Sequence, residues 1–290
     1  MQQALELINK LYQQWKGREA ASVDILPKSG SERRYFRVHE QDGGTIIATL
    51  GANVQENETF IYFSRHFKKI GLPVPEILVT NEDGTIYLQQ DFGNISLLNY
   101  LEKEGFSDHV YELFKKSLHE LARLQVKAHE DMDYEYCLTN KEFGKEAIMA
   151  DLLYFKYYFL DALRRPYDKQ KLLNDFEALS NYLAHTEFKY FMFRDFQSRN
   201  IMVTPDDEVY FIDYQGGMQG APQYDVANVM AGPGQFTRRV ERKVTGRLYG
   251  FIWQTDQPTI KQSHVSHSIQ WLCADPFITG FGRLWFSWIV

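Results

Sequence analysis

The sequence predicts an α+β fold in which a small, strand-rich lobe is followed by a larger and mainly helical lobe. Short β-prone runs dominate residues 23–90, whereas apolar residues recur at helical spacing after Gly93. A chain of 290 residues, 44% of them hydrophobic, can bury one large core or two lobes. We therefore expect a first lobe at residues 1–92 and a second lobe at residues 93–227.

The first lobe is predicted to begin with an amphipathic helix and a hairpin. Across residues 1–16 the apolar side chains are spaced for one face of a helix, and Gly17 follows its end. Two β-prone runs, at residues 35–38 and 45–48, flank a glycine-rich turn sequence at residues 42–44. This pattern predicts two antiparallel strands.

A second helix and a further strand follow in the first lobe. Gly71 and Pro73 end the helix, and Glu58 near its start is expected to face the functional site. The apolar residues that share one face of this helix are Phe60, Phe63, Phe67 and Ile70. Residues 87–90 have the composition of a strand and lead into a turn at residues 91–94.

The second lobe is predicted to contain helices and then a pair of short strands. The expected helices are residues 108–124, residues 152–163 and about 171–183. Ser107 precedes the first of them and can cap it. Apolar runs at residues 201–203 and 209–212 then flank a turn sequence at residues 205–207, which predicts two short strands.

The strongest chemical signal is the segment Phe-Arg-Asp-Phe-Gln-Ser-Arg-Asn at residues 193–200. It matches the protein-kinase catalytic loop His-Arg-Asp-x-x-x-x-Asn at every defined position except the histidine, which Phe193 replaces. Phosphoryl transfer needs a carboxylate that takes the proton of the attacking hydroxyl, which suits Asp195. It also needs hard oxygen ligands for Mg²⁺, which suits Asn200 and Asp213. The spacing therefore predicts a protein-kinase-like fold that uses ATP and Mg²⁺.

The same region carries a family resemblance. Residues 191–226 resemble the aminoglycoside phosphotransferase and choline kinase superfamily, and residues 194–200, 212–215 and 224–227 are similar to the anomeric kinases of N-acetylmuramate and N-acetylglucosamine. The resemblance implies transfer of the ATP γ-phosphate to the C1 hydroxyl of an amino sugar. It also implies that Asp225 supports the catalytic loop through backbone hydrogen bonds, whereas its position alone also fits a helix N-cap. An aminoglycoside or choline-type acceptor is the alternative.

The first lobe is expected to bind the nucleotide. Ser29, Gly30 and Ser31 form a loop between two predicted strands, where hydroxyls and backbone amides can cover phosphates. With a single glycine, an ordinary hairpin turn explains the same loop. Gln90 and Asp91 end the strand whose backbone is expected to meet adenine. The residues expected to position the site residues without contacting the substrate are Arg194, Arg199, Gln215, Asp225 and Glu58.

One departure from the kinase pattern concerns the cation that normally holds the nucleotide phosphates. No lysine occurs between Lys28 and Lys68, so the central strands of the first lobe supply none. Arg33, Arg34 or Arg37 can hold phosphate instead, although a solvated charge cluster explains these residues equally well. An inactive nucleotide-binding relative is therefore the alternative from a different functional class.

An aromatic run in the second lobe has two interpretations. Its members are Tyr154, Phe155, Tyr157, Tyr158 and Phe159. We expect them mainly to form the core of the lobe, with stacking on a sugar ring as the alternative.

Composition excludes several other classes of protein. The net charge of −6 gives no general attraction to nucleic acid, so none is expected as a partner. The chain has only two cysteines, Cys137 and Cys273, which fits a reducing compartment without a disulfide framework. No stretch approaches the roughly 20 apolar residues that a membrane span needs. We expect a cytoplasmic protein whose partner is a small molecule with a hydroxyl group.

The tail at residues 228–290 departs from this pattern. Four of the five tryptophans, Trp253, Trp271, Trp285 and Trp288, lie there, and no helical periodicity is sustained. Residues 227–290 hold 7 Lys+Arg and 3 Asp+Glu, or +4, against 25 and 35, or −10, in the remainder of the chain. A shifted reading frame near Asn228 would explain this change, because the displaced codons permit an amphipathic sequence. A divergent tail is the alternative, and the coding DNA distinguishes the two.

Overall fold

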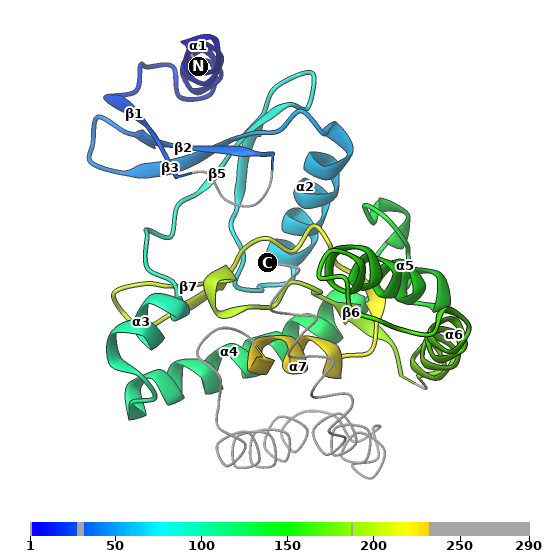
Figure 1. Ribbon diagram of the computed structural model, residues 1–290. Helices are drawn as coiled ribbons and strands as arrows, with labels where there is room; N and C mark the ends of the chain where they lie inside the picture. Colours follow the sequence, from blue (N-terminus) through cyan, green and yellow to red (C-terminus); the bar gives the residue numbers. More distant parts are fainter. Residues whose placement is uncertain (1, 28–31, 187, 232–290) are drawn as a thin grey trace.

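The computed structural model describes residues 2–27, 32–186 and 188–231, and within them the chain forms two lobes. The first lobe is built on a five-stranded sheet of order β1-β2-β3-β5-β4, with α1 against it, and the helices of the second lobe lie below (Figure 1). The first-lobe elements are α1 Gln2–Lys16, β1 Ser22–Ile25, β2 Arg34–His39, β3 Thr45–Leu50, α2 Val54–Lys69, β4 Ile77–Thr80 and β5 Ile86–Gln90. The strand-rich first part and the mainly helical second part predicted from the sequence therefore form an α+β fold, as expected.

The predicted hairpin is present as β2 and β3. Phe36 pairs with Ala48 and Val38 with Ile46, and all four side chains are buried against α1. Gly43, in the turn, has a φ of +90°, a conformation that glycine adopts without the steric cost other residues meet. The edge strands β1 and β4 were not predicted individually, because each is a run of only four residues.

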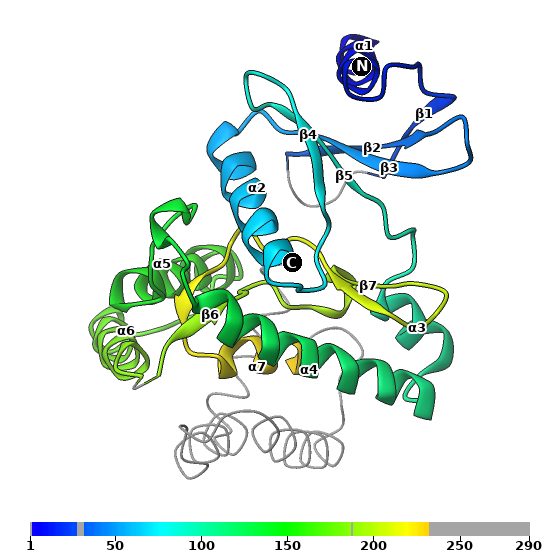
Figure 2. The same cartoon turned by 180° about the vertical axis from the view of Figure 1, so that it is seen from behind.

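Helix α2 joins the core of the second lobe, although it lies in the first lobe in sequence. Phe60 stacks on Tyr214 with ring centroids 4.8 Å apart, and Phe67 meets Phe191 edge to face at 5.0 Å. The hydroxyls of Ser64 and Tyr214 form a buried hydrogen bond of 2.6 Å. These contacts fix α2, and every residue that it carries, relative to the segments around residues 191–214 (Figure 2).

The second lobe contains helices and two small two-stranded sheets, β6–β9 and β7–β8. Its elements are α3 Leu97–Glu104, α4 Asp108–His129, a 3-10 turn Tyr134–Tyr136, α5 Lys145–Phe155, a π-helix Lys156–Asp161, α6 Lys169–Ala184, β6 Tyr190–Met192, a 3-10 turn Ser198–Asn200, β7 Ile201–Val203, β8 Val209–Phe211, β9 Met218–Gly220 and α7 Gln223–Ala231. Within the described ranges, no helix is both long and apolar enough to cross a membrane.

The sequence predicted some of these helices correctly and missed or misplaced others. Ser107 caps α4 by accepting a hydrogen bond from the Val110 amide, as predicted. Helix α3 was not predicted, although Ser96 and Asn99 form a reciprocal capping box at its start. Helix α5 begins at Lys145, and the prediction placed its start at residue 152. The sequence missed the first turns because the apolar residues there show only weak helical periodicity.

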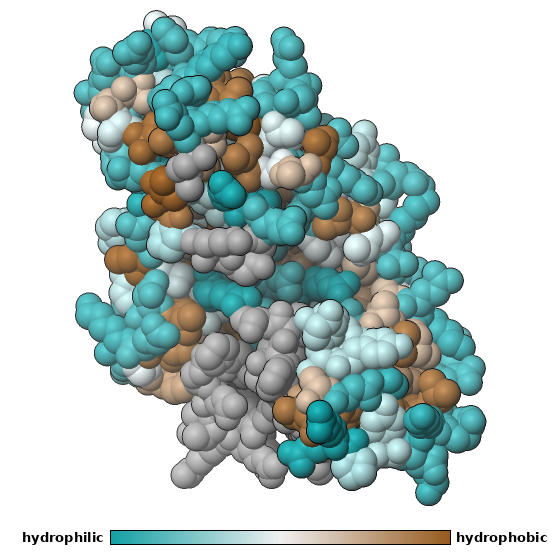
Figure 3. All heavy atoms as spheres, turned by 45° about the horizontal axis from the view of Figure 1, so that its top comes forward, coloured by the Kyte–Doolittle hydropathy of each residue, from teal (hydrophilic) through white to brown (hydrophobic). Residues whose placement is uncertain are grey.

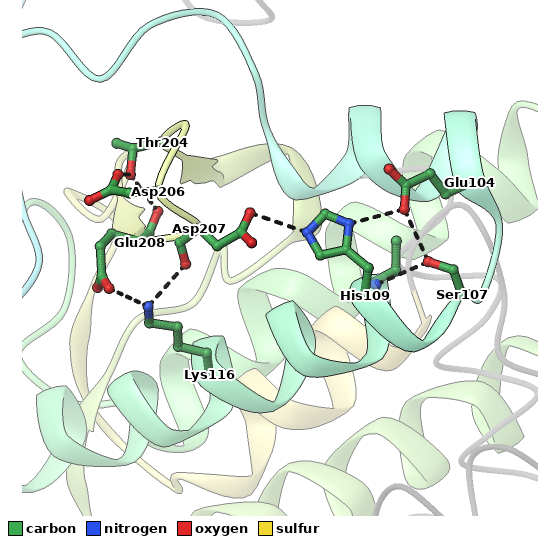
Figure 4. A network of polar contacts seen from close by, with 9 residues as sticks. Glu104, Ser107, His109, Lys116, Thr204, Asp206, Asp207 and Glu208 are labelled. Atoms are coloured by element: carbon green, nitrogen blue, oxygen red, sulfur yellow. Dashed lines mark hydrogen bonds and ion pairs between the residues drawn. The ribbon is translucent and has the colours of Figure 1, made fainter.

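Hairpin β7–β8 follows the catalytic-loop motif, and the turn at the tip of this hairpin contacts α4 (Figure 4). His109 contacts both Glu104 and the Asp207 carboxylate, at 3.0 and 3.1 Å. Lys116 donates to the Asp207 carbonyl at 3.0 Å and to Glu208 at 2.6 Å. The turn predicted at residues 205–207 is therefore held by charged side chains, and this limits the movement of the hairpin.

Helix α7 spans the position between residues 227 and 228 at which the second lobe was expected to end. Asn228 and Val229 are 1% and 4% exposed. The Asn228 side-chain amide donates to the Arg194 carbonyl in the catalytic-loop motif. The tail predicted at residues 228–290 therefore shares its first residues with this helix, and residues 232–290 lie outside the described part of the chain.

Candidate active site

The catalytic-loop motif connects β6 to β7 and lies on aromatic packing. Phe193, which replaces the kinase histidine, is fully buried. Its ring meets Phe196 edge to face at 5.4 Å and Tyr214 at 5.9 Å. Because an apolar ring occupies this position, the start of the loop is fixed by packing instead of by a histidine hydrogen bond.

Asp225 holds the backbone of this loop. Its carboxylate accepts hydrogen bonds from the amides of Phe193 and Arg194, both 2.8 Å long, and from the Gln125 side chain at 2.7 Å. Asp225 lies in the first turn of α7 with no exposed surface, and its carboxylate joins the loop to Gln125 of α4. Burial raises its pKa to about 7, and the three N–H donors oppose that rise by stabilising the carboxylate. Arg194 has a φ of +73°, a strained conformation that these contacts keep in place.

Asp195 is placed next to the segment that contains Asp213. A Cβ added to Gly216 would lie 3.3 Å from Asp195 Oδ2, so the chain after Asp213 passes directly beside this carboxylate. Burial, followed by the charge of Asp213, raises the pKa of Asp195 to about 6, whereas Arg194 and the exposed Arg199 oppose the rise. Asp195 is therefore mostly ionised at neutral pH while remaining basic enough to accept a proton.

The hairpin β7–β8 brings Asn200 and Asp213 to the same end of two paired strands. Ile201 pairs with Phe211, and the Ile212 amide donates to the Asn200 carbonyl at 3.1 Å. The Asn200 side chain donates to the Asp195 carbonyl at 2.9 Å, which leaves its amide oxygen to act as a ligand.

These donor atoms fit Mg²⁺ that is shared with a nucleotide. The described residues contain no group of three or more His, Cys, Asp or Glu side chains that could hold a metal by themselves. Mg²⁺ is commonly held by one or two protein oxygens together with phosphates and water. One amide oxygen and one carboxylate, from Asn200 and Asp213, therefore suit an ion that arrives with ATP.

A buried arginine reaches Asp213 from the first lobe. Arg33 is 3% exposed, and its Nη2 donates to Asp213 Oδ1 at 2.9 Å. Its Nε lies 3.2 Å from Glu56 Oε1 on α2. Gln215 also donates to Asp213 Oδ1, at 3.0 Å. Strongly hydrophilic residues line the middle of the face shown in Figure 3, between the two lobes.

Glu56, not the predicted Glu58, is the acidic residue of α2 that faces this site. Glu58 is exposed, and Glu56 is partly buried against Arg33. Helical spacing could have identified Glu56, because it precedes Phe60 by one turn on the buried face that Phe63 and Phe67 continue.

The two residues predicted at the hinge make contacts within the protein. The Asp91 carboxylate accepts hydrogen bonds from Nε and Nη2 of Arg37, 2.6 and 3.1 Å long, and the Asp91 side chain is 2% exposed. The Gln90 side chain accepts from Lys68 at 3.3 Å. The Asp91 side chain therefore links β2 to the connection between the lobes, and the Gln90 backbone amide donates to the Glu76 carbonyl at 3.0 Å. Ser29, Gly30 and Ser31 lie outside the described residues.

Helix α5 and the π-helix that continues it contribute two features beside the catalytic loop. Asp151 accepts from Arg194 Nη2 at 2.6 Å, so α5 is attached directly to the catalytic loop. The aromatic run expected in the core is divided: Phe155 is buried, whereas Tyr154, Tyr157 and Tyr158 are 41%, 58% and 58% exposed. The rings of Tyr154 and Tyr158 stack with centroids 4.3 Å apart. Nothing in the spacing marked Asp151, which lies among apolar residues.

Comparisons with known proteins agree with this geometry. The sequence profile of the phosphotransferase enzyme family matches residues 25–258, which extends past residue 227, where the resemblance was expected to end. Among curated protein sequences, none matches the chain.

Three similar solved structures support the fold. A choline kinase, LicA, from Streptococcus pneumoniae has a TM-score of 0.62 at 15% identity, over 97% of this chain and 90% of that one. The aminoglycoside phosphotransferase APH(2'')-IIa in complex with gentamicin has a TM-score of 0.60 at 15% identity, over 98% and 95%. ADP-bound APH(2'')-Ib has a TM-score of 0.58 at 17% identity, over 94% and 91%. These similarities confirm the predicted protein-kinase-like fold.

Proposed function

This chain belongs to the phosphotransferase enzyme family and is a small-molecule phosphotransferase, and we propose that it moves the γ-phosphate of ATP to the C1 hydroxyl of an amino sugar. The acceptor we favour is N-acetylmuramate or N-acetylglucosamine. Residues 1–92 would bind the nucleotide, and residues 93–227 would carry the catalytic loop and the metal site. ATP as donor agrees with solved relatives that are bound to ADP or AMP-PNP.

One observation carries the proposal. Asp195 lies beside the segment of Asp213 on a loop whose backbone is held by the buried Asp225. A base with a pKa of about 6 next to two metal-ligand candidates is the arrangement that transfer to a hydroxyl requires.

In the proposed reaction, the C1 hydroxyl oxygen of the sugar forms a bond to the γ-phosphorus of ATP. The bond between that phosphorus and the oxygen bridging it to the β-phosphate breaks, and ADP leaves. The hydroxyl proton passes to the Asp195 carboxylate, which hydrogen-bonds and orients the hydroxyl beforehand. When bound, Mg²⁺ neutralises phosphate charge, and Asn200 and Asp213 would hold it.

An amino-sugar acceptor is favoured by the motif resemblance and by the surface of α5. Tyr154 on α5 and Tyr158 on the following π-helix expose a stacked aromatic pair, and Asp151 links α5 to Arg194 of the catalytic loop. Aromatic rings offer large, rigid apolar faces, which suit the apolar face of a sugar ring. An aminoglycoside or choline-type acceptor remains the alternative, because solved relatives include both kinds of kinase.

A phosphotransfer assay with Mg-ATP and several acceptors tests the proposal. We expect turnover with N-acetylmuramate and N-acetylglucosamine, and none with choline or kanamycin. The methyl glycoside of N-acetylglucosamine is a matched control, because its C1 oxygen carries no proton to transfer. Turnover of that glycoside would refute transfer to C1. Nucleotide binding without transfer to any acceptor would instead indicate an inactive relative.

A further inference from the structure

The central strands of the first lobe contain no lysine that could bind phosphate, because no lysine lies between Lys28 and Lys68. Triphosphate nevertheless brings several negative charges into a site that already contains Asp195 and Asp213. Mg²⁺ would neutralise only part of this charge, so a positively charged side chain close to the metal ligands would further stabilise the bound triphosphate.

Arg33 meets the geometric requirements for that group. Nη2 contacts Asp213 Oδ1 at 2.9 Å, so the guanidinium already lies beside a proposed metal ligand. Glu56 fixes its position from α2, with Oε1 3.2 Å from Nε. The buried Nε forms an ion pair with Glu56 but makes no hydrogen bond with a described residue, so its N–H is an unused donor.

We propose that Arg33 binds the nucleotide phosphates in place of the missing lysine and that Glu56 positions it for this role. The inference rests on the proposed function, since it concerns the same nucleotide. It assigns the phosphate-binding cation to the segment that precedes β2, whereas the expected position is inside a central strand.

The neighbouring arginines do not meet these requirements. Arg34 is exposed, and because it is adjacent to Arg33 in an extended segment, its side chain points away from it. Arg37 is engaged by Asp91, Asn94 and the Gly93 carbonyl at the hinge. Arg33 is therefore the member of this cluster that contacts a residue of the proposed metal site.

A purely structural role for Arg33 makes a different prediction. An ion pair that only holds the two lobes together would affect every ligand of the cleft equally. A phosphate ligand would affect ATP and leave adenosine unchanged, since adenosine has no phosphate. Comparing the affinities of these two ligands therefore separates the two roles.

The test measures binding of ATP and of adenosine to the full chain by calorimetry, together with ATP kinetics. For Arg33→Ala we expect ATP affinity to fall about 10- to 100-fold, the range for losing hydrogen bonds to a charged group, with adenosine affinity unchanged. Arg33→Lys should recover part of the loss, because lysine keeps the charge but not the paired donors. Glu56→Gln should weaken ATP binding less, and Arg34→Ala should match the parent protein.

Equal losses of ATP and adenosine affinity, or no loss of either, would overturn the inference. The outcome is independent of the acceptor. If the parent protein transfers phosphate and Arg33→Ala is indistinguishable from it, the inference fails while the proposed function stands. If ATP binding depends on Arg33 but no acceptor is phosphorylated, the proposed reaction fails instead.

Discussion

Arg33 and Asp213 are 180 positions apart in sequence, yet Nη2 of one lies 2.9 Å from Oδ1 of the other. The contact joins the first lobe to the segment after β8, and Glu56 extends it to α2. A carboxylate that would bind Mg²⁺ with nucleotide is therefore paired with a cation of the protein itself.

This pairing predicts that Arg33 competes with metal ions in the nucleotide-free protein. Removing the guanidinium in Arg33→Ala leaves Asp213 Oδ1 with the Gln215 hydrogen bond alone, so affinity for Mn²⁺ alone should rise about three- to tenfold, equivalent to roughly 0.5–1.5 kcal/mol. Electron paramagnetic resonance of free Mn²⁺ measures this directly. Arg34→Ala is the control and should not change the affinity. Unaltered Mn²⁺ binding in Arg33→Ala would show that the pair does not compete with metal.

Asp225 should be essential for the stability of the second lobe. In Asp225→Ala, two buried amides and the Gln125 side chain lose their acceptor, which is expected to cost about 3–5 kcal/mol in the free energy of unfolding. Asp175→Ala, an exposed aspartate of α6, is the matched control and should change stability by less than about 0.5 kcal/mol. Urea unfolding measures both variants. Equal stability of the two would contradict the role assigned to Asp225.

Local patterns were sufficient to predict several elements of the fold. The hairpin β2–β3, helix α2 and the capped start of α4 follow from turn chemistry, periodicity and a serine cap, all of which act within a few residues. Edge strand β4 and helix α3 were missed, because four-residue strands and eight-residue helices contain too few residues to show a period.

The candidate site was only partly predictable for the same reason. Asp195, Asn200 and Asp213 belong to one contiguous motif with diagnostic spacing. Glu56 and Asp151 act through tertiary contacts with Arg33 and Arg194, which no spacing along the chain reveals.

Tyr154 and Tyr158 should contribute to acceptor binding and not to nucleotide binding. Replacing both with alanine removes the stacked pair, and loss of roughly 0.5–1.5 kcal/mol of aromatic contact would raise the KM for the amino sugar about three- to tenfold. The KM for ATP should stay the same. Tyr182→Ala is a suitable control, because this tyrosine of α6 is 64% exposed. An unchanged sugar KM in the double variant would argue against stacking.

The contacts of His109 with Glu104 and Asp207 should make the stability of the fold depend on pH. Hydrogen bonds to Glu104 and Asp207 raise the pKa of His109, so its contribution is complete below the pKa of an unfolded histidine and is lost as pH rises through the folded value. The hydrogen bond from His109 lowers the pKa of Glu104, so that contribution is lost as pH falls through the folded value. His109→Gln should therefore lower the melting temperature more at pH 6 than at pH 8. His185→Gln is the control, and an equal decrease at both pH values would refute the charged contacts of His109.

Asp195 should set the acid limb of the pH–rate profile. Burial, and then the charge of Asp213, raise its pKa to about 6, so kcat/KM should be level above pH 7 and fall about tenfold for each pH unit well below 6. Asp195→Asn keeps the shape but cannot take a proton, and its kcat should fall about 10²- to 10⁴-fold without the acid limb. Arg199→Ala removes a charge that opposes the raised pKa, so the limb should move to higher pH. If Arg199→Ala moved the limb to lower pH, or if Asp195→Asn retained the parent profile, the base would have to be another group.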